Sequence, residues 1–366
     1  MYPATAPRAY YPALDILRGC AILAVVFFHN FEGVRFFQFG WLGVDLFFVL
    51  SGFLITEILL SSLGNKFYFR NFFIRRVLRI FPLYYLILFL FFTLSPVLFS
   101  QKGPQSTFSY YNSNKIWFWG YIQNWLMVKN GPAPVPYLTH FWSLGVEEQF
   151  YFFWPFVLFC CRRLTVLKKV VIGLIVFSVS YRSLTWWLHP FETETYYCNT
   201  FTRMDALLIG SLLAIHLRQG KLISSILIKT IFTAFAVLFL TSLWVLGNLD
   251  RGNAVFATVG YTIADLFFAI LLYLFISKGE TLKHILHRLS ALRFIGKISY
   301  GIYVYHVPIY LVLATQCSKV LNEFVNNAEE TSLLVSILSV LITLAASVFS
   351  FYILEKPILS LKKYFP

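Results

Sequence analysis

Long apolar runs recur along the whole chain, and they constrain its fold more than any other feature. Hydrophobic residues make up 58% of the 366 residues and charged residues only 13%. A helix needs about 20 apolar residues to cross a bilayer, and helices satisfy their own backbone polar groups there. We therefore expect an all-α polytopic membrane protein with about ten transmembrane helices. The predicted spans are about 11–31, 41–62, 77–99, 140–161, 168–187, 203–217, 227–247, 255–277, 298–318 and 332–354.

The basic residues fall mainly in alternate short loops. With the N-terminus inside, the inner loops hold twenty Lys and Arg and the outer loops six. Because cytoplasmic loops carry an excess of these residues, the pattern predicts that both termini are cytoplasmic. The net charge of +14 thus reflects topology, and no nucleic-acid partner is expected. We expect one integral-membrane domain, 1–366, whose first span is retained as a signal anchor since Asp15 and Arg18 interrupt it.

Arg18 and His29 lie in the first predicted span, where ionisable side chains are costly and rare unless they serve a function. They are eleven residues apart, which is about three helical turns, so both lie on one face of the helix. The imidazole is a candidate general base. A cation and an imidazole on one stripe suggest an aligned path through the membrane.

Asp45 begins the second span after a short connection, so it is expected at nearly the same depth as His29. A carboxylate there would orient the imidazole and stabilise its charged form. A carboxylate at a helix N-terminus is also favourable without any function. The presence of two ionisable groups at one depth favours the functional interpretation.

Three arginines, Arg75, Arg76 and Arg79, mark the start of the third span. Basic residues at this position often serve only to set topology. Arg76 and Arg79 are nevertheless on one helical side, and guanidinium groups at that spacing suit phosphate recognition. We expect these arginines to bind a cytosolic phosphate-bearing ligand.

The fourth span opens with HFWSLGVEEQFYFFWP, and adjacent acids occupy its interior. Glu147 and Glu148 point about 100° apart, so they cannot both face one cavity. Ser143, Glu147 and Tyr151 share a stripe. Unpaired acids in lipid are costly, so at least one should line a polar cavity. Glu147, Glu148, Ser143 and His140 are candidate substrate-binding or catalytic residues.

The segment 100–139 is the longest predicted outer loop. Its aromatic part, KIWFWGYIQNWLMV, is expected to form a short interfacial helix. Its GPAPVPY part is expected to form an extended lid or access loop.

The remaining ionisable residues are weaker candidates. Arg203 and Asp205 begin the sixth span, where they could form a plain ion pair, and Arg203 is also a candidate substrate-binding residue. Arg182 and Asp265 have no obvious partner. His306 precedes Pro308 and is expected to pack at a kink. Five scattered cysteines show no metal-type pairing, so no metal site is expected.

Six segments in order carry a family resemblance: LDILRGCAILAVVFFH, GVDLFFVLSGFLIT, RRVLRIFPLYY, HFWSLGVEEQFYFFWP, TRMDALLIG and ISYGIYVYHVP. Together they resemble the integral-membrane acyltransferase 3 family, which includes enzymes that O-acetylate bacterial surface polysaccharides. The resemblance covers about residues 11–310. We expect no C-terminal hydrolase-like domain of the kind fused to some members.

The resemblance implies an acyl-CoA donor, usually acetyl-CoA, that enters from the cytoplasm as a substrate, with no permanently bound cofactor. It implies a carbohydrate acceptor and a multi-pass location in the cytoplasmic (inner) membrane. Arg18 and His29 match the family's essential pair, and Arg76 and Arg79 match the arginine pair assigned to the donor. Glu147 matches the acid of its WSLxxEEQFY segment, and Asp45 falls in its second-span motif.

We therefore predict transfer of an acyl group across the membrane, with His29 as general base or, as an alternative, as the carrier of the acyl group. Asp45 is expected to orient His29, and Glu147 to position the acceptor or balance Arg18. The competing hypothesis is a transporter or flippase for a lipid-linked glycan, and a membrane scaffold ranks third. Transfer of label from acetyl-CoA to a glycan separates them.

Overall fold

The structure is a computed structural model that describes residues 12–99, 105–161, 163–245, 251–277, 288–317 and 328–365. These residues are mostly helical and contain no strand. Its α-helices are α1 (Pro12–Asn30), α2 (Leu42–Ser62), α3 (Tyr68–Phe99), α4 (Gln105–Ser113), α5 (Lys115–Trp119), α6 (Gln123–Asn130), α7 (Trp142–Cys160), α8 (Leu164–Leu188), α9 (Thr193–Tyr197), α10 (Thr200–Arg218), α11 (Ser225–Val245), α12 (Tyr261–Ser277), α14 (Ser290–Lys297), α15 (Ser299–Val312), α17 (Ala328–Ser350) and α18 (Lys356–Ser360). Short 3₁₀ and π turns are η1 (Arg35–Phe37), η2 (Thr139–Phe141), η3 (Phe256–Gly260), η4 (Leu313–Cys317), η5 (Phe351–Glu355) and η6 (Leu361–Tyr364).

The all-α polytopic prediction is confirmed, but the number of spans differs from ten. Within the described residues, eight helical segments are long and apolar enough to cross a membrane, or nine if the bent pair α14–α15 forms one span. The predicted span 140–161 is the helix α7, which is not among them. Its polar first half, with Glu147 and Glu148, explains why it falls below the hydropathy of a typical span.

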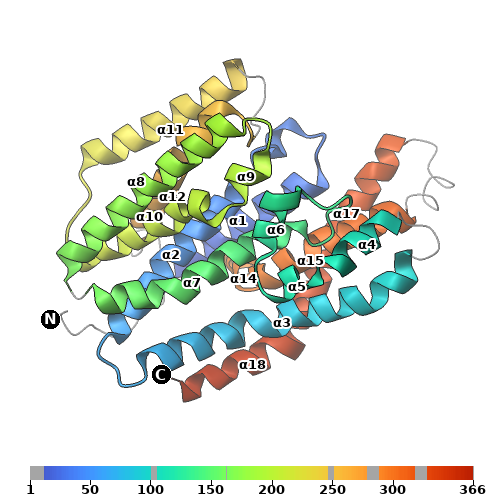
Figure 1. The fold of residues 1–366 in the computed structure, drawn as a ribbon, viewed down its shortest axis with the longest axis horizontal. Helices are drawn as coiled ribbons and strands as arrows, with labels where there is room; N and C mark the ends of the chain where they lie inside the picture. Colours follow the sequence, from blue (N-terminus) through green and yellow to red (C-terminus); the bar gives the residue numbers. More distant parts are fainter. Residues whose placement is uncertain are drawn as a thin grey trace.

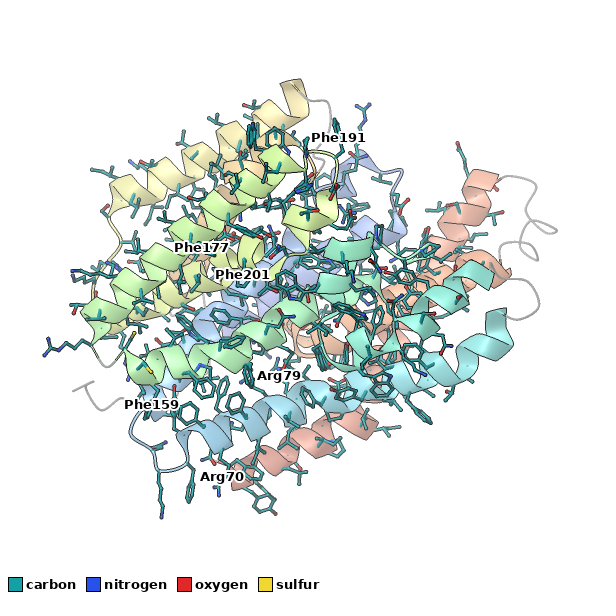
Figure 2. All side chains as sticks on the ribbon, in the orientation of Figure 1. Arg70, Arg79, Phe159, Phe177, Phe191 and Phe201 are labelled. Atoms are coloured by element: carbon teal, nitrogen blue, oxygen red, sulfur yellow. The ribbon has the colours of Figure 1, made fainter. Side chains whose placement is uncertain are left out.

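The outer surface of the helix bundle is rich in exposed aromatic side chains. Phe159 of α7, Phe177 of α8 and Phe201 of α10, labelled in Figure 2, are each 44–47% exposed. An exposed apolar surface of this extent would be unfavourable in water. It is the surface that a lipid bilayer would cover.

Figure 1 shows α8 and α11 along one side of the bundle and α3 and α18 along the opposite side, with α1, α2 and α7 between them. The helices α2 and α10 approach closely because glycines lie at their contact. A Cβ atom on Gly52 would lie 1.8 Å from the Leu207 carbonyl oxygen, and one on Gly210 would lie 2.0 Å from the Val49 carbonyl oxygen. Small residues at such contacts allow close backbone packing between membrane helices. This contact fixes the position of α2, whose residues line the cavities described below.

The described ends of the chain lie together. Arg75 near the start of α3 donates a 2.9 Å hydrogen bond to the carbonyl oxygen of Phe365. At the start of α1, the Asp15 carbonyl oxygen lies against Gly296 of α14. Arg18 of α1 and Arg79 of α3 line one cavity, so the starts of α1 and α3 and the C-terminal residues share one end of the bundle. The assignment of this end to the cytoplasm stays a prediction.

Candidate active site

A cavity of about 100 Å³ lies between α1, α2, α3, α7 and α15, and we call it the arginine cavity. Three guanidinium groups reach it from two helices: Arg18 of α1 and Arg76 and Arg79 of α3. Figure 2 labels Arg79 on the side of α3 that faces α7. The other polar residues that line the cavity are Ser51, Ser143, Glu147, Tyr151, Ser299, Tyr300 and Tyr303. The expected grouping of Arg18, Arg76 and Arg79 is therefore present, and it forms a cationic site inside the bundle.

Two carboxylates neighbour the guanidinium groups of this cavity. Arg18 pairs with Asp15 one turn earlier, with Nη1 and Oδ1 3.1 Å apart. Glu147 accepts a 2.7 Å hydrogen bond at Oε1 from the Ser51 hydroxyl. Glu147, Ser143 and Tyr151 all line the arginine cavity, so the predicted stripe of α7 is confirmed. With three guanidinium groups and one lining carboxylate, the cavity favours an anionic ligand.

Two predicted residues lie outside the arginine cavity. Glu148 lines a separate cavity of about 340 Å³ between α3, α5 and α7, so the two adjacent acids do face different spaces. Arg75 is on the far side of α3, where it donates to Phe365 and lines a small cavity with Tyr68 and Asn71. The expected contribution of Arg75 to the phosphate site therefore has no geometric support.

A larger cavity of about 360 Å³ contains His29 and His140, and we call it the histidine cavity. The GPAPVPY segment contributes Pro132, Ala133 and Pro136 to its wall, as expected of an access loop. His140 is 5% exposed, and neither of its ring nitrogens has a hydrogen-bond partner among the described residues. His140 thus contributes a buried imidazole to the wall of this cavity.

His29 is held by contacts from α1 and α15. Its Nδ1 lies 3.0 Å from the Val25 carbonyl oxygen and 3.3 Å from Nε2 of His306. His306 is expected to pack near Pro308; the structure shows it fully buried in α15, and it also contacts His29. The two histidines are 277 residues apart in sequence. The sequence feature that could have indicated a functional role for His306 is that an imidazole is rare in an apolar span.

The arginine and histidine cavities share two lining residues, Val44 and Tyr303. The Tyr303 hydroxyl lies 2.5 Å from the Ser143 hydroxyl and donates a 2.6 Å hydrogen bond to the His140 carbonyl oxygen. Arg18 and His29 therefore line two adjoining cavities instead of the single path suggested by their common helix face. Val44 and Tyr303 therefore lie where the two cavities adjoin.

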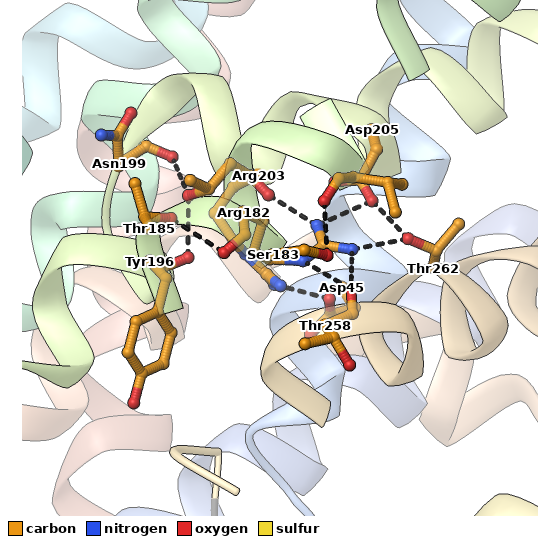
Figure 3. A network of polar contacts seen from close by, with 12 residues as sticks. Asp45, Arg182, Ser183, Thr185, Tyr196, Asn199, Arg203, Asp205, Thr258 and Thr262 are labelled. Carbon is orange, nitrogen blue, oxygen red and sulfur yellow. Dashed lines mark hydrogen bonds and ion pairs between the residues drawn. The ribbon is translucent and has the colours of Figure 1, made fainter. Parts of the chain in front are cut away.

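Asp45 does not contact His29, which corrects the expected orienting role. Figure 3 shows it paired with Arg203 of α10, with Oδ1 and Nη2 2.5 Å apart and both side chains fully buried. The guanidinium of Arg203 also lies 4.2 Å from the centre of the Tyr261 ring. Arg203 is thus enclosed, and it lines neither the arginine cavity nor the histidine cavity, so it has no geometric support as a substrate-binding residue.

The expected ion pair between Arg203 and Asp205 is also absent among the described contacts, because each of these residues pairs with a different partner. Asp205 accepts a 2.8 Å hydrogen bond from Arg182 of α8, and Thr262 of α12 donates to the same oxygen. Arg182 also donates to the carbonyl oxygens of Thr202 and Thr258. This buried network joins α2, α8, α10 and α12 and lies apart from both cavities. We assign it to the stability of the bundle.

No group of three or more His, Cys, Asp or Glu side chains among the described residues could hold a metal ion.

Comparison with known proteins places the chain in a family. A family model described as an acyltransferase domain matches residues 11–354. The peptidoglycan O-acetyltransferase OatA of Listeria monocytogenes is 30% identical over 379 residues, with 96% of this chain and 56% of that protein covered. YrhL of Bacillus subtilis is 32% identical over 379 residues, with 98% and 56% covered. The chain thus spans little more than half the length of these relatives. No solved structure matches it.

Proposed function

Because the chain belongs to the acyltransferase domain family, we propose that it is a membrane O-acetyltransferase that moves an acetyl group from acetyl-CoA to a hydroxyl group of a glycan across the membrane. The observation that carries this proposal is the pair of adjoining cavities, one lined by three guanidinium groups and the other by His29. The two cavities would receive donor and acceptor from opposite directions.

The arginine cavity suits the donor substrate. Guanidinium groups bind phosphate oxygens by charge-assisted hydrogen bonds, and Arg76 and Arg79 lie one helical turn apart on α3. The donor would bind through its phosphates near the start of α3 and extend its thioester past Arg18 toward Tyr303.

The thioester would reach His29 past Val44 and Tyr303, the two residues that line both cavities. In the transfer step, His29 takes the proton of the acceptor hydroxyl while that oxygen bonds to the thioester carbonyl carbon. The carbon–sulfur bond then breaks, and the sulfur takes the proton from the imidazolium. Products are an O-acetyl ester and free CoA, so no further reactant is needed.

The histidine cavity suits the acceptor. At about 360 Å³ it is the larger of the two, and both His29 and His140 line it. Glu147 and Ser143 lie across Tyr303 in the arginine cavity, where Glu147 would balance Arg18. The names of the relatives make peptidoglycan the first acceptor to test. A surface-glycan acceptor implies a place in the cytoplasmic membrane.

The test is incubation of membranes containing the protein with acetyl-CoA labelled in the acetyl group and with a peptidoglycan or lipid-linked glycan. Labelled glycan that loses its label on mild alkaline treatment, as an ester does, supports the proposal. Glycan that crosses the membrane without label would instead support a transporter. Neither label nor movement would refute both.

A further inference from the structure

We infer that His306 is a positioning residue that, together with the Val25 carbonyl oxygen, holds His29 in the tautomer with the proton on Nδ1, leaving the Nε2 lone pair to act as the base. This inference rests on the proposed function for its catalytic consequence. The structural evidence is a chain of three contacts. His306 contacts the Tyr303 carbonyl oxygen, His306 contacts His29, and His29 contacts the Val25 carbonyl oxygen.

The protons of this chain can be assigned from its two ends. His306 Nδ1 lies 2.7 Å from the Tyr303 carbonyl oxygen, and His29 Nδ1 lies 3.0 Å from the Val25 carbonyl oxygen. A carbonyl oxygen only accepts, so both Nδ1 atoms must carry a proton. A neutral His306 then presents a lone pair at Nε2. The proton on His29 Nδ1 is shared between the Val25 oxygen and this lone pair, 3.3 Å away.

The surroundings favour a neutral His306. Its side chain is fully buried, and the nearest other ring is His140, with centroids 5.0 Å apart. A second proton on His306 would point from Nε2 at the protonated Nδ1 of His29, which is a repulsive arrangement. Burial of a charge without a paired carboxylate is also costly. Asp45, the one carboxylate expected to serve His29, pairs instead with Arg203.

This arrangement leaves His29 Nε2 unoccupied in the wall of the histidine cavity. Nε2 has no hydrogen-bond partner among the described residues, and His29 lines that cavity. When Nε2 takes the acceptor proton, the ring becomes a cation whose Nδ1 proton still faces His306 Nε2. His306 thus plays the part that a carboxylate plays in a catalytic triad, but without a charge.

The test compares two variants at one position. His306→Leu keeps a similar volume but removes the acceptor, whereas His306→Gln places an amide oxygen near the position of Nε2. We expect His306→Leu to lower kcat about 10–100-fold, which is the range found when a partner that orients a metal-binding histidine is removed. The KM for acetyl-CoA should stay unchanged, because His306 does not line the arginine cavity. His306→Gln should retain kcat within about threefold of the wild type.

A kcat of wild-type size in His306→Leu, or equal losses in both variants, would overturn the inference. Solid-state NMR of the wild-type protein with 15N-labelled histidine gives an independent readout, with the His29 signals identified from their absence in His29→Ala. We expect a protonated Nδ1 and an unprotonated Nε2, and the opposite tautomer would overturn the inference. If the wild type transfers no acetyl group, the proposed function fails, whereas the NMR result still decides the tautomer.

Discussion

The ion pair between Asp45 and Arg203 provides a sharp test of how the bundle is held together. Both side chains are fully buried, and the pair links α2 to α10 at the glycine-mediated contact between these helices. Removing one partner leaves the other charge buried without compensation. Such changes cost about 3–5 kcal/mol. We therefore expect Arg203→Met and Asp45→Asn each to lower the free energy of unfolding by about this amount.

The assay is SDS-induced unfolding of the purified protein in detergent micelles. The double variant Asp45→Asn/Arg203→Met no longer holds an unpaired charge at this position, so it should be less destabilised than the sum of the single variants by about 1–3 kcal/mol. Lys221→Met, an exposed change of the same kind, is the matched control and should lie within about 0.5 kcal/mol of the wild type.

The assignment of this pair to stability would be refuted if each single variant lowered the free energy of unfolding by less than about 1 kcal/mol. It would also be refuted if the effects of the two single variants simply added in the double variant. The same variants also test the expectation that was corrected above. If Asp45 only stabilises the bundle, the acetyl transfer of Asp45→Asn should fall in proportion to the amount of folded protein. A larger loss per folded molecule would return Asp45 to the reaction.

Three further predictions follow from the cavities and the helix contacts. Arg79→Met should raise the KM for acetyl-CoA about 10–100-fold, because a hydrogen bond to a charged group contributes about 1.5–3 kcal/mol. Arg75 lies outside the cavity, so Arg75→Met should leave this KM unchanged. An equal rise in KM for both variants would remove Arg79 from the donor site. Gly52→Ala should destabilise the protein by about 1–3 kcal/mol through its clash with α10, whereas Gly173→Ala, with open space around it, should not destabilise it in the same unfolding assay. Tyr303→Phe should lower the free energy of unfolding by about 1–3 kcal/mol, because the buried His140 carbonyl oxygen and Ser143 hydroxyl each lose a hydrogen-bond partner. An unchanged free energy of unfolding would contradict these contacts.

Features that depend on one helix were predictable from the sequence. The apolar runs predicted the helices, and the 100° step between adjacent residues placed Glu147 and Glu148 in different cavities. The spacing of Arg76 and Arg79 likewise placed both on the side of α3 that faces the arginine cavity. These inferences need only the geometry of a single helix.

Features that depend on the rotation of one helix against another were not predictable. Asp45 was placed at a depth similar to that of His29, but depth does not determine the direction in which a side chain points. α2 presents Asp45 to α10, where Arg203 lies. The partner of His29 is instead His306, which comes from a helix far along the chain. The partner of Asp45 and the partner of His29 therefore both depend on packing between helices that are distant in sequence.

The central claim is transfer of an acetyl group across the membrane through His29. Its most direct test uses sealed proteoliposomes, with labelled acetyl-CoA present only on the side at which α3 begins and the glycan present only on the other side. Cysteine labelling of positions near the start of α3 identifies that side. The account predicts labelled glycan with the wild type and none above background with folded His29→Ala. Equal labelling by His29→Ala, or transfer only when donor and acceptor share one side, would contradict it.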